Sequence, residues 1–201
     1  TWYWHSFIFY NYTVFHNIAS EPTIDIISEG RTAAVGCGAD CIIALGGGSV
    51  LDTCKIIAAG AKIKKRKSEN LLRKFIYIRG KTLPIIAVPS TAGTGAEITV
   101  AAMVQNKKGI KDSTVVIGLN VTHVVFDSEL TIAAPESITI YCGIDALSHG
   151  LEGCLADIKS SEEDILKSRE CVKLVFENLP RLISTPADVN ARQQMGLAAY
   201  Y

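Results

Sequence analysis

Long hydrophobic runs, paired cysteines and an excess of charge of either sign are all missing from this 201-residue chain. No run of about 18 or more apolar residues occurs, so the sequence predicts no transmembrane helix. The 20 basic and 20 acidic residues give a net charge of zero, which argues against nucleic acid or an acidic membrane as partner. Nine basic residues gather in 62–81, a run typical of a solvated helix and loop.

The six cysteines form no Cys-x-x-Cys pair, which excludes zinc ribbons and thioredoxin-like redox sites. We expect reduced, mostly buried thiols and a cytoplasmic protein. The 48% of hydrophobic residues suffices for a large core and excludes a disordered chain. The cysteines are Cys37, Cys41, Cys54, Cys142, Cys154 and Cys171.

The first fifteen residues lack the features of a secretion signal. They have neither a basic start nor a small-residue cleavage site, and the chain begins with Thr1 in place of an initiator Met. Eight aromatic side chains lie in this short segment. We therefore expect either that the chain begins within a longer reading frame or that this segment is atypical.

Two short apolar runs, each followed by a glycine-rich turn, indicate an α/β arrangement. Residues 41–45 and 83–88 are continuous apolar runs, the pattern of strands covered on both faces. Apolar residues at helical spacing predict helices over 23–34 and 50–61. Further strands are expected at 98–104, 114–117 and 123–126.

From residue 128 onward the pattern changes to helices. Pro135 and Glu136 predict the start of one helix, and Asp145 the start of another. Residues 164–179 carry apolar side chains at helical spacing, and residues 191–201 open a further helix. The sequence thus predicts an α/β region up to residue 127 and an all-helical region after it.

Gly46-Gly47-Gly48-Ser49 stands between a predicted strand and a predicted helix. Glycines let a phosphate approach the backbone, and the first-turn N–H groups of the helix favour an anion. The motif is neither a P-loop nor the Gly-x-Gly-x-x-Gly fingerprint, and a tight turn without ligand is the alternative. Asp52, one turn into the helix, stabilises that turn or contacts the ligand.

Ser90-Thr91-Ala92-Gly93-Thr94-Gly95 supplies hydroxyl and N–H groups after the second predicted strand. Ligands of open α/β sheets bind beyond the carboxyl ends of the strands. Two such loops predict one shared crevice suited to a nucleotide. An ordinary Ser/Thr turn is the alternative for this second loop.

Asp145 and His149 are four residues apart, and on a helix this spacing places both side chains on one face. A carboxylate and an imidazole can together bind Fe²⁺, Zn²⁺ or Mn²⁺. The alternative is a solvated or mutually hydrogen-bonded pair.

Residues 46–55, 89–99 and 143–152, in this order, resemble three successive signatures of the iron-containing (group III) alcohol dehydrogenase family. The resemblance runs from about Glu21 to the end of the chain. It implies a partial dinucleotide-binding (Rossmann-like) parallel-sheet domain over 1–127, incomplete at its N-terminus. It further implies a helical metal-binding domain over 128–201, incomplete at its C-terminus, with the active site in the cleft between them.

The same resemblance implies a cofactor site and half of a metal site. Asp145 and His149 would be two ligands of Fe²⁺, with Zn²⁺ as the alternative metal. The family's two further histidine ligands lie downstream of a helix like 191–201, and no histidine follows His149 here. Gly47, Gly48 and Ser49 would hold the pyrophosphate of NAD or NADP, and Lys111 the ribose side. The whole cofactor set is Gly47, Gly48, Ser49, Asp52, Ser90, Thr91, Thr94 and Lys111.

The activity implied is that of a metal-dependent, NAD(P)-linked alcohol dehydrogenase or aldehyde reductase for a small alcohol or aldehyde. We expect the full-length form to be a homo-oligomer. One alternative is a non-catalytic nucleotide-binding fragment or assembly module. Another is a sister enzyme such as glycerol dehydrogenase or dehydroquinate synthase, although Ser49, residues 91–95 and the Asp145-x-x-x-His149 spacing favour the alcohol dehydrogenase branch.

Overall fold

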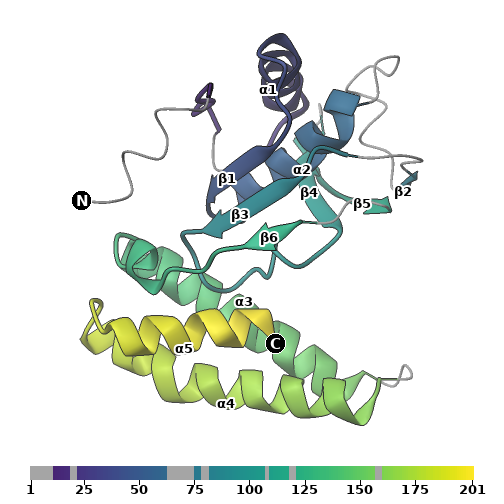
Figure 1. Ribbon diagram of the computed structural model, residues 1–201. Coiled ribbons are helices and arrows are strands. Elements are labelled where there is room, and N and C mark those ends of the chain that lie inside the picture. Colours follow the sequence, from purple (N-terminus) through teal and green to yellow (C-terminus); the bar gives the residue numbers. More distant parts are fainter. Residues whose placement is uncertain are drawn as a thin grey trace.

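The computed structural model describes residues 11–18, 22–62, 75–77, 82–106, 109–117, 121–156 and 160–201. An α/β part lies above a layer of three long helices (Figure 1), so the predicted α/β class is confirmed. In chain order the elements are α1 (Ile24–Gly36), β1 (Ile42–Gly46), α2 (Gly48–Lys62), β2 (Phe75–Tyr77), β3 (Ile85–Pro89), β4 (Ala101–Gln105), β5 (Lys111–Ile117), β6 (His123–Val124), η3 (Ser128–Thr131), α3 (Glu136–Leu155), α4 (Glu162–Ser184) and α5 (Val189–Tyr200).

The first sheet has the strand order β1-β3-β6 and is parallel throughout. Gly46, the last residue of β1, is paired with Pro89, the last residue of β3. Because parallel strands run in the same direction, both strands end at the same edge of the sheet. Each of the two glycine-rich loops therefore begins at that edge.

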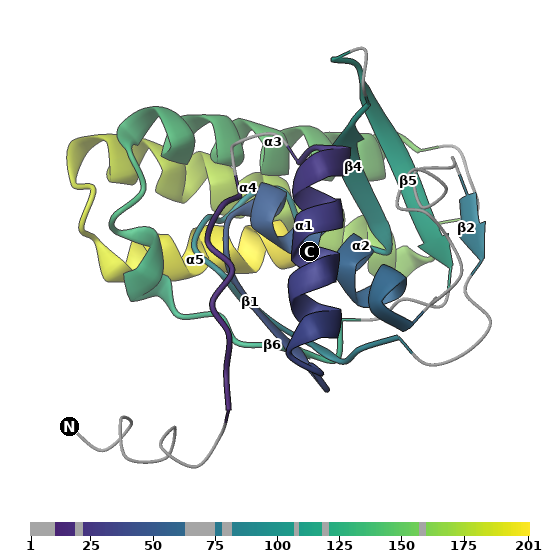
Figure 2. The same ribbon diagram turned by 90° about the horizontal axis from the view of Figure 1, so that it is seen from above.

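The second sheet has the order β2-β5-β4 and contains an antiparallel hairpin of β4 and β5. Its register pairs Ala101 with Val115 and Gln105 with Lys111. Figure 2 shows this hairpin beside α1 and α2. The strand predicted at 98–104 begins later than expected, at Ala101. The basic run 62–81 includes β2, and most of the run lies outside the described residues.

Helix α2 is the centre of the α/β core. Every residue from Leu51 to Gly60 is buried, because the parallel sheet, α1 and β4 all pack against this helix. Within β1, Ala44 is fully buried, whereas Ile43 and Leu45 are 53% and 59% exposed. The expectation that β1 is covered on both faces is therefore wrong for the described part of the chain. A continuous apolar run marks two buried faces only where a second layer covers the sheet.

The helical layer packs through α3, α4 and α5. Helix α3 runs without interruption from Glu136 to Leu155, so the prediction that Asp145 begins a separate helix is wrong. No proline follows Pro135 within this stretch, and Gly143 lies against Leu179 of α4, which allows close packing of the two helices. None of the helices in the described ranges combines the length and apolar character needed to cross a bilayer.

Helix α4 begins and ends outside the range expected from its apolar spacing. Ser161 accepts a hydrogen bond from the N–H of Asp164 at 3.2 Å, and the Asp164 carboxylate accepts one from the N–H of Ser161 at 3.0 Å. This capping box starts the helix at Glu162. The helix continues through Pro180, because the buried side chains of Leu179 and Leu182 keep it packed against the layer.

The burial of the thiols predicts their reactivity. All six cysteines are free, with Cys37 and Cys41 exposed and Cys54 buried. Burial raises the pKa of Cys54 to about 12, which suppresses the reactive thiolate. At about pH 8 we expect a maleimide to label Cys37 and Cys41 quickly and Cys54 only after unfolding, as followed by peptide mass spectrometry. Fast labelling of Cys54 in the native protein would show that α2 is not buried in solution.

Candidate cofactor and metal site

The two glycine-rich loops lie side by side at the carboxyl edge of the parallel sheet. The ladder between β1 and β3 continues past the strand ends, where the N–H of Ser90 donates to the carbonyl of Gly46 at 2.9 Å. Ser90 is thus a half-buried residue of the edge itself. The predicted proximity of the two loops is confirmed by this bond.

The first loop is also in van der Waals contact with the second. A Cβ atom on Gly47 would lie 3.3 Å from Thr91 Cγ2 and Oγ1. A Cβ atom on Gly48 would lie 3.0 Å from Thr94 Oγ1. A side chain at either glycine would therefore press against a threonine of the second loop, so the close approach of the two loops favours glycine at both positions.

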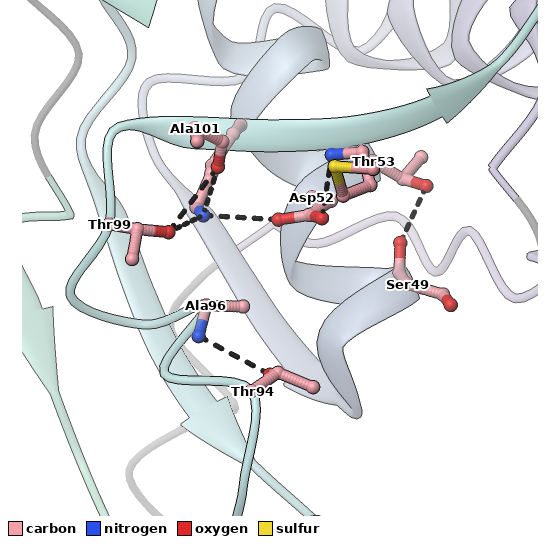
Figure 3. A network of polar contacts seen from close by, with 9 residues as sticks. Ser49, Asp52, Thr53, Thr94, Ala96, Thr99 and Ala101 are labelled. Carbon is pink, nitrogen blue, oxygen red and sulfur yellow. Dashed lines mark hydrogen bonds and ion pairs between the residues drawn. The ribbon is translucent and has the colours of Figure 1, made fainter. Parts of the chain in front are cut away.

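The amino end of α2, which directly follows the first glycine-rich loop, favours the binding of an anion. The N–H groups of Val50 and Leu51 donate to the carbonyl of Gly47 at 3.0 and 3.1 Å, which closes the first turn. The helix dipole adds partial positive charge at this end of α2. The half-buried Ser49 lies in this turn, and its carbonyl accepts a hydrogen bond from Thr53 Oγ1 at 2.8 Å (Figure 3). The loop fits a phosphate group.

The carboxylate of Asp52 accepts hydrogen bonds from groups outside the first turn of α2. Its Oδ1 atom accepts a hydrogen bond from Lys55 Nζ at 3.1 Å, and its Oδ2 atom accepts one from the N–H of Met103 at 2.9 Å. The residue is buried. These contacts join α2 to β4, whereas contact of Asp52 with a cofactor stays a prediction.

The sequence motifs did not point to Lys55, although it is the largest fully buried side chain in the described chain. Its ammonium donates to Asp52, to Thr99 Oγ1 at 3.1 Å and to the Ala101 carbonyl at 2.8 Å. Desolvation lowers the pKa of Lys55, and the negative charge of Asp52 opposes that shift. One signal was available in the sequence: Asp52 and Lys55 are the only charged residues between Gly48 and Ala61.

Glu97 is a third buried ionisable side chain, near this pair. Only 6% of the residue is exposed, and desolvation raises the pKa of its carboxyl while the charge of Lys55 lowers it. The side chain therefore adds an acidic group close to the Lys55 ammonium.

The second glycine loop also touches the helix that carries the predicted metal ligands. A methyl group on Gly93 would overlap the carbonyl group of Cys142 in α3. Burial raises the pKa of the Cys142 thiol, its hydrogen bond with Thr91 lowers it, and the charge of Asp145 raises it. The loop between β3 and β4 is thus held between the first glycine loop and the turn of α3 that precedes Asp145.

Asp145 and His149 face each other on α3. Asp145 Oδ1 and His149 Nε2 are 4.0 Å apart, and their side chains are 45% and 56% exposed. A carboxylate and an imidazole suit Fe²⁺ and Zn²⁺, and partial exposure leaves both donors accessible. No group of three or more His, Cys, Asp and Glu side chains that could hold a metal occurs within the described ranges. The pair therefore fits part of a metal site.

Lys111 lies on the hairpin. It is the first residue of β5, opposite Gln105 of β4, and its side chain is exposed. The hairpin contacts α2 through β4. The role of Lys111 at the ribose stays a prediction.

Known proteins similar to this chain share one family. The chain is 30% identical to the aldehyde-alcohol dehydrogenase of Streptococcus pneumoniae, over 92% of this chain and 22% of that protein. It is 27% identical to the lactaldehyde reductase of Escherichia coli, over 94% of this chain and 49% of that protein. The chain thus spans about half the length, or less, of these curated relatives.

Solved structures agree with this result. The sulfoacetaldehyde reductase of Bifidobacterium kashiwanohense in complex with NAD⁺ superposes with a TM-score of 0.88 at 30% identity, over 94% of this chain and 50% of that one. The iron-containing alcohol dehydrogenase of Thermotoga maritima gives a TM-score of 0.84 at 27% identity, over 94% and 51%.

Two sequence profiles cover most of the chain. The profile described as iron-containing alcohol dehydrogenase matches residues 9–128. The profile of the C-terminal part of the Fe-containing alcohol dehydrogenase family matches residues 139–201. The chain therefore belongs to the iron-containing alcohol dehydrogenase family.

Proposed function

We propose that the protein containing this chain is a metal-dependent, NAD(P)-linked alcohol dehydrogenase or aldehyde reductase. The observation that carries this proposal is the position of the loop over residues 90–95. It touches the phosphate-binding loop through Thr91 and Thr94, and it touches α3 through Gly93. A dinucleotide bound along the two loops would extend toward Asp145 and His149.

In this proposal Gly47, Gly48 and Ser49 hold the pyrophosphate. Their support is the contact between the two loops at the carboxyl edge of the sheet and the positive end of α2. Ser90, Thr91 and Thr94 line the crevice with hydroxyl groups. The NAD⁺ complex of the similar sulfoacetaldehyde reductase and the name of the NAD-dependent methanol dehydrogenase of Bacillus methanolicus, 29% identical over 93% of this chain and 49% of that protein, favour NAD as the cofactor.

Asp145 and His149 would hold the metal ion together with further ligands, Fe²⁺ by the family's name and Zn²⁺ as the alternative. When bound, such an ion polarises the oxygen of the alcohol or aldehyde, and the nicotinamide exchanges the hydride. Helix α3 would place both ligand side chains on one face, next to the loop that orients the cofactor. The substrate would be a small alcohol or aldehyde, in keeping with the names of the relatives.

The six free cysteines support a reducing compartment such as the cytoplasm. Homo-oligomerisation of the full-length protein and the division into domains at residue 127 remain part of the proposal.

The complete gene product tests the proposed function. We expect it to bind NADH or NADPH in a fluorescence titration, to retain Fe or Zn, and to oxidise short-chain alcohols with reduction of NAD⁺ or NADP⁺. Absence of dinucleotide binding would disprove the proposal. Binding without any oxidation by the metal-loaded protein would instead favour the non-catalytic module, and preference for glycerol would favour the sister enzyme.

The substitution Gly48→Val should weaken dinucleotide binding while the protein still folds. Its Cβ atom would lie 3.0 Å from Thr94 Oγ1, so the two loops would have to move apart and the added methyl groups would cover the backbone proposed to hold the phosphate. Loss of one hydrogen bond to a charged phosphate lowers affinity by about ten- to a hundredfold, which an NADH titration measures. Gly36→Ala is the control, because nothing lies within 4 Å of a Cβ there. NADH affinity equal in Gly48→Val and the wild type would contradict the assignment of this loop.

A further inference from the structure

We infer that Lys55 and Asp52 are positioning residues for the dinucleotide, because they fix the distance between the two glycine-rich loops. We call Lys55, Asp52 and their partners Thr99, Ala101 and Met103 the Lys55 clamp. Figure 3 labels Asp52, Thr99 and Ala101 of this group. The inference rests on the proposed function, in which one ligand spans both loops.

The clamp joins the chain segments that directly follow the two loops. Asp52 lies in α2, four residues after Gly48 of the first loop, and Thr99 comes four residues after Gly95 of the second loop. Lys55 Nζ lies 3.1 Å from Thr99 Oγ1 and 2.8 Å from the carbonyl oxygen of Ala101. Asp52 Oδ2 lies 2.9 Å from the backbone nitrogen of Met103. Movement of one segment against the other would break these bonds.

The hydrogen bonds of the Lys55 clamp are directional, and they use every donor of the ammonium group. A lysine ammonium has three N–H donors, and Lys55 has three acceptors: Asp52 Oδ1, Thr99 Oγ1 and the carbonyl of Ala101. The Lys55 side chain is 0% exposed, so water does not compete for these donors. One arrangement of α2 and β4 therefore satisfies the ammonium, and the contacts between Gly48 and Thr94 depend on that arrangement.

The packing of α2 does not by itself require charged side chains at Asp52 and Lys55. Every residue of α2 from Leu51 to Gly60 is buried, and Asp52 and Lys55 are the charged ones among them. A buried ion pair is often replaceable by apolar residues of similar volume without loss of stability, whereas the pair imposes a specific geometry. Desolvation lowers the pKa of Lys55, and the charges of Asp52 and Glu97 oppose this shift. Apolar residues could fill this region equally well. The contribution of the polar pair is therefore to fix the position of α2 relative to β4.

The test compares a ligand that spans both loops with one that needs the first loop only. NADH is the spanning ligand, and ADP carries the adenosine and the two phosphates without the nicotinamide riboside. Two forms of the complete protein are compared with the wild type: Lys55→Met, and the double variant Asp52→Leu/Lys55→Met, which removes both charges of the pair. Ile57→Ala is the matched control, because this buried residue of α2 packs against Gly30 of α1, away from the clamp.

We expect the clamp variants to bind NADH about tenfold more weakly or worse, the effect of losing one charge-assisted hydrogen bond. Their affinity for ADP should stay within about threefold of wild type, a change of less than about 0.7 kcal/mol. Both affinities should be unchanged in Ile57→Ala, measured below its melting temperature. A role in stability alone would not change the ratio of the two affinities.

Three outcomes would overturn the inference. The double variant could bind NADH as tightly as wild type, or both ligands could weaken by the same factor. Failure of both clamp variants to fold would assign the cluster to folding instead. A wild-type protein that binds ADP but not NADH would contradict the proposed function first, and the inference with it.

Discussion

Asp145→Ala should lose the metal ion and, with it, alcohol oxidation, with kcat/KM reduced about a thousandfold or more, since Lewis-acid stabilisation contributes several kcal/mol. His149→Ala should behave in the same way. Both side chains are about half exposed, with Oδ1 and Nε2 4.0 Å apart, so neither supports the core, and in the proposed function both donate to the ion. The melting temperature of the metal-free protein should change little, because exposed substitutions stay within about 0.5 kcal/mol, whereas only the wild type should gain stability when the metal is added.

Metal content measured by mass spectrometry, together with steady-state kinetics of the complete protein, decides this prediction. Ser148→Ala is the matched control on the same exposed turn, where the hydroxyl donates to the carbonyl of Ile144. It should retain both metal and activity. Full activity in Asp145→Ala and His149→Ala would remove the basis for a metal site on α3.

Gly93→Ala should lower kcat/KM about a hundredfold, because a displacement near 1 Å in an active site has an effect of this size. The added methyl group would overlap the carbonyl of Cys142, so the loop and α3 must move apart. Overpacking of this kind also destabilises the fold by about 1–3 kcal/mol. The metal ligands are untouched, so the variant should keep its metal, in contrast to Asp145→Ala.

Gly153→Ala is the control for the overpacking that Gly93→Ala introduces. A methyl group there would overlap the Ser168 side chain of α4, on the same helix α3 but away from the glycine loops. We expect a smaller fall in the denaturant midpoint than for Gly93→Ala, because the Ser168 hydroxyl can rotate away, with activity within about threefold of wild type. Equal losses of activity in the two glycine variants would indicate that the position of the loop on α3 does not matter for hydride transfer.

Local patterns were sufficient for several parts of the fold. The two apolar runs became β1 and β3, and the Gly46–Ser49 turn stands between a strand and α2 as expected. These features depend on neighbouring residues, whose spacing decides which face is apolar and where a turn occurs. The spacing of Asp145 and His149 was equally informative, because both lie on one turn of the same helix.

Other features were not visible in local patterns. A single helix α3 replaced two predicted ones, since helix packing against α4 stabilises a continuous segment that contains Gly143 and Gly150. The exposed side chains of Ile43 and Leu45 were predicted as buried, because an apolar run does not reveal which layers cover it. Lys55 lay inside a quoted motif, yet its burial was not inferred from the motif.

The sequence by itself determined the order of the three motifs, the resemblance to the family, and the residues expected to face the cofactor and the metal. Each of these rests on residues a few positions apart, where backbone geometry dictates proximity. Only the tertiary structure decided that Gly93 contacts the Cys142 backbone and that Lys55 bonds to Thr99 and Ala101, which are 44 and 46 residues away. Such contacts depend on how strands and helices pack, and that arrangement is a property of the whole core.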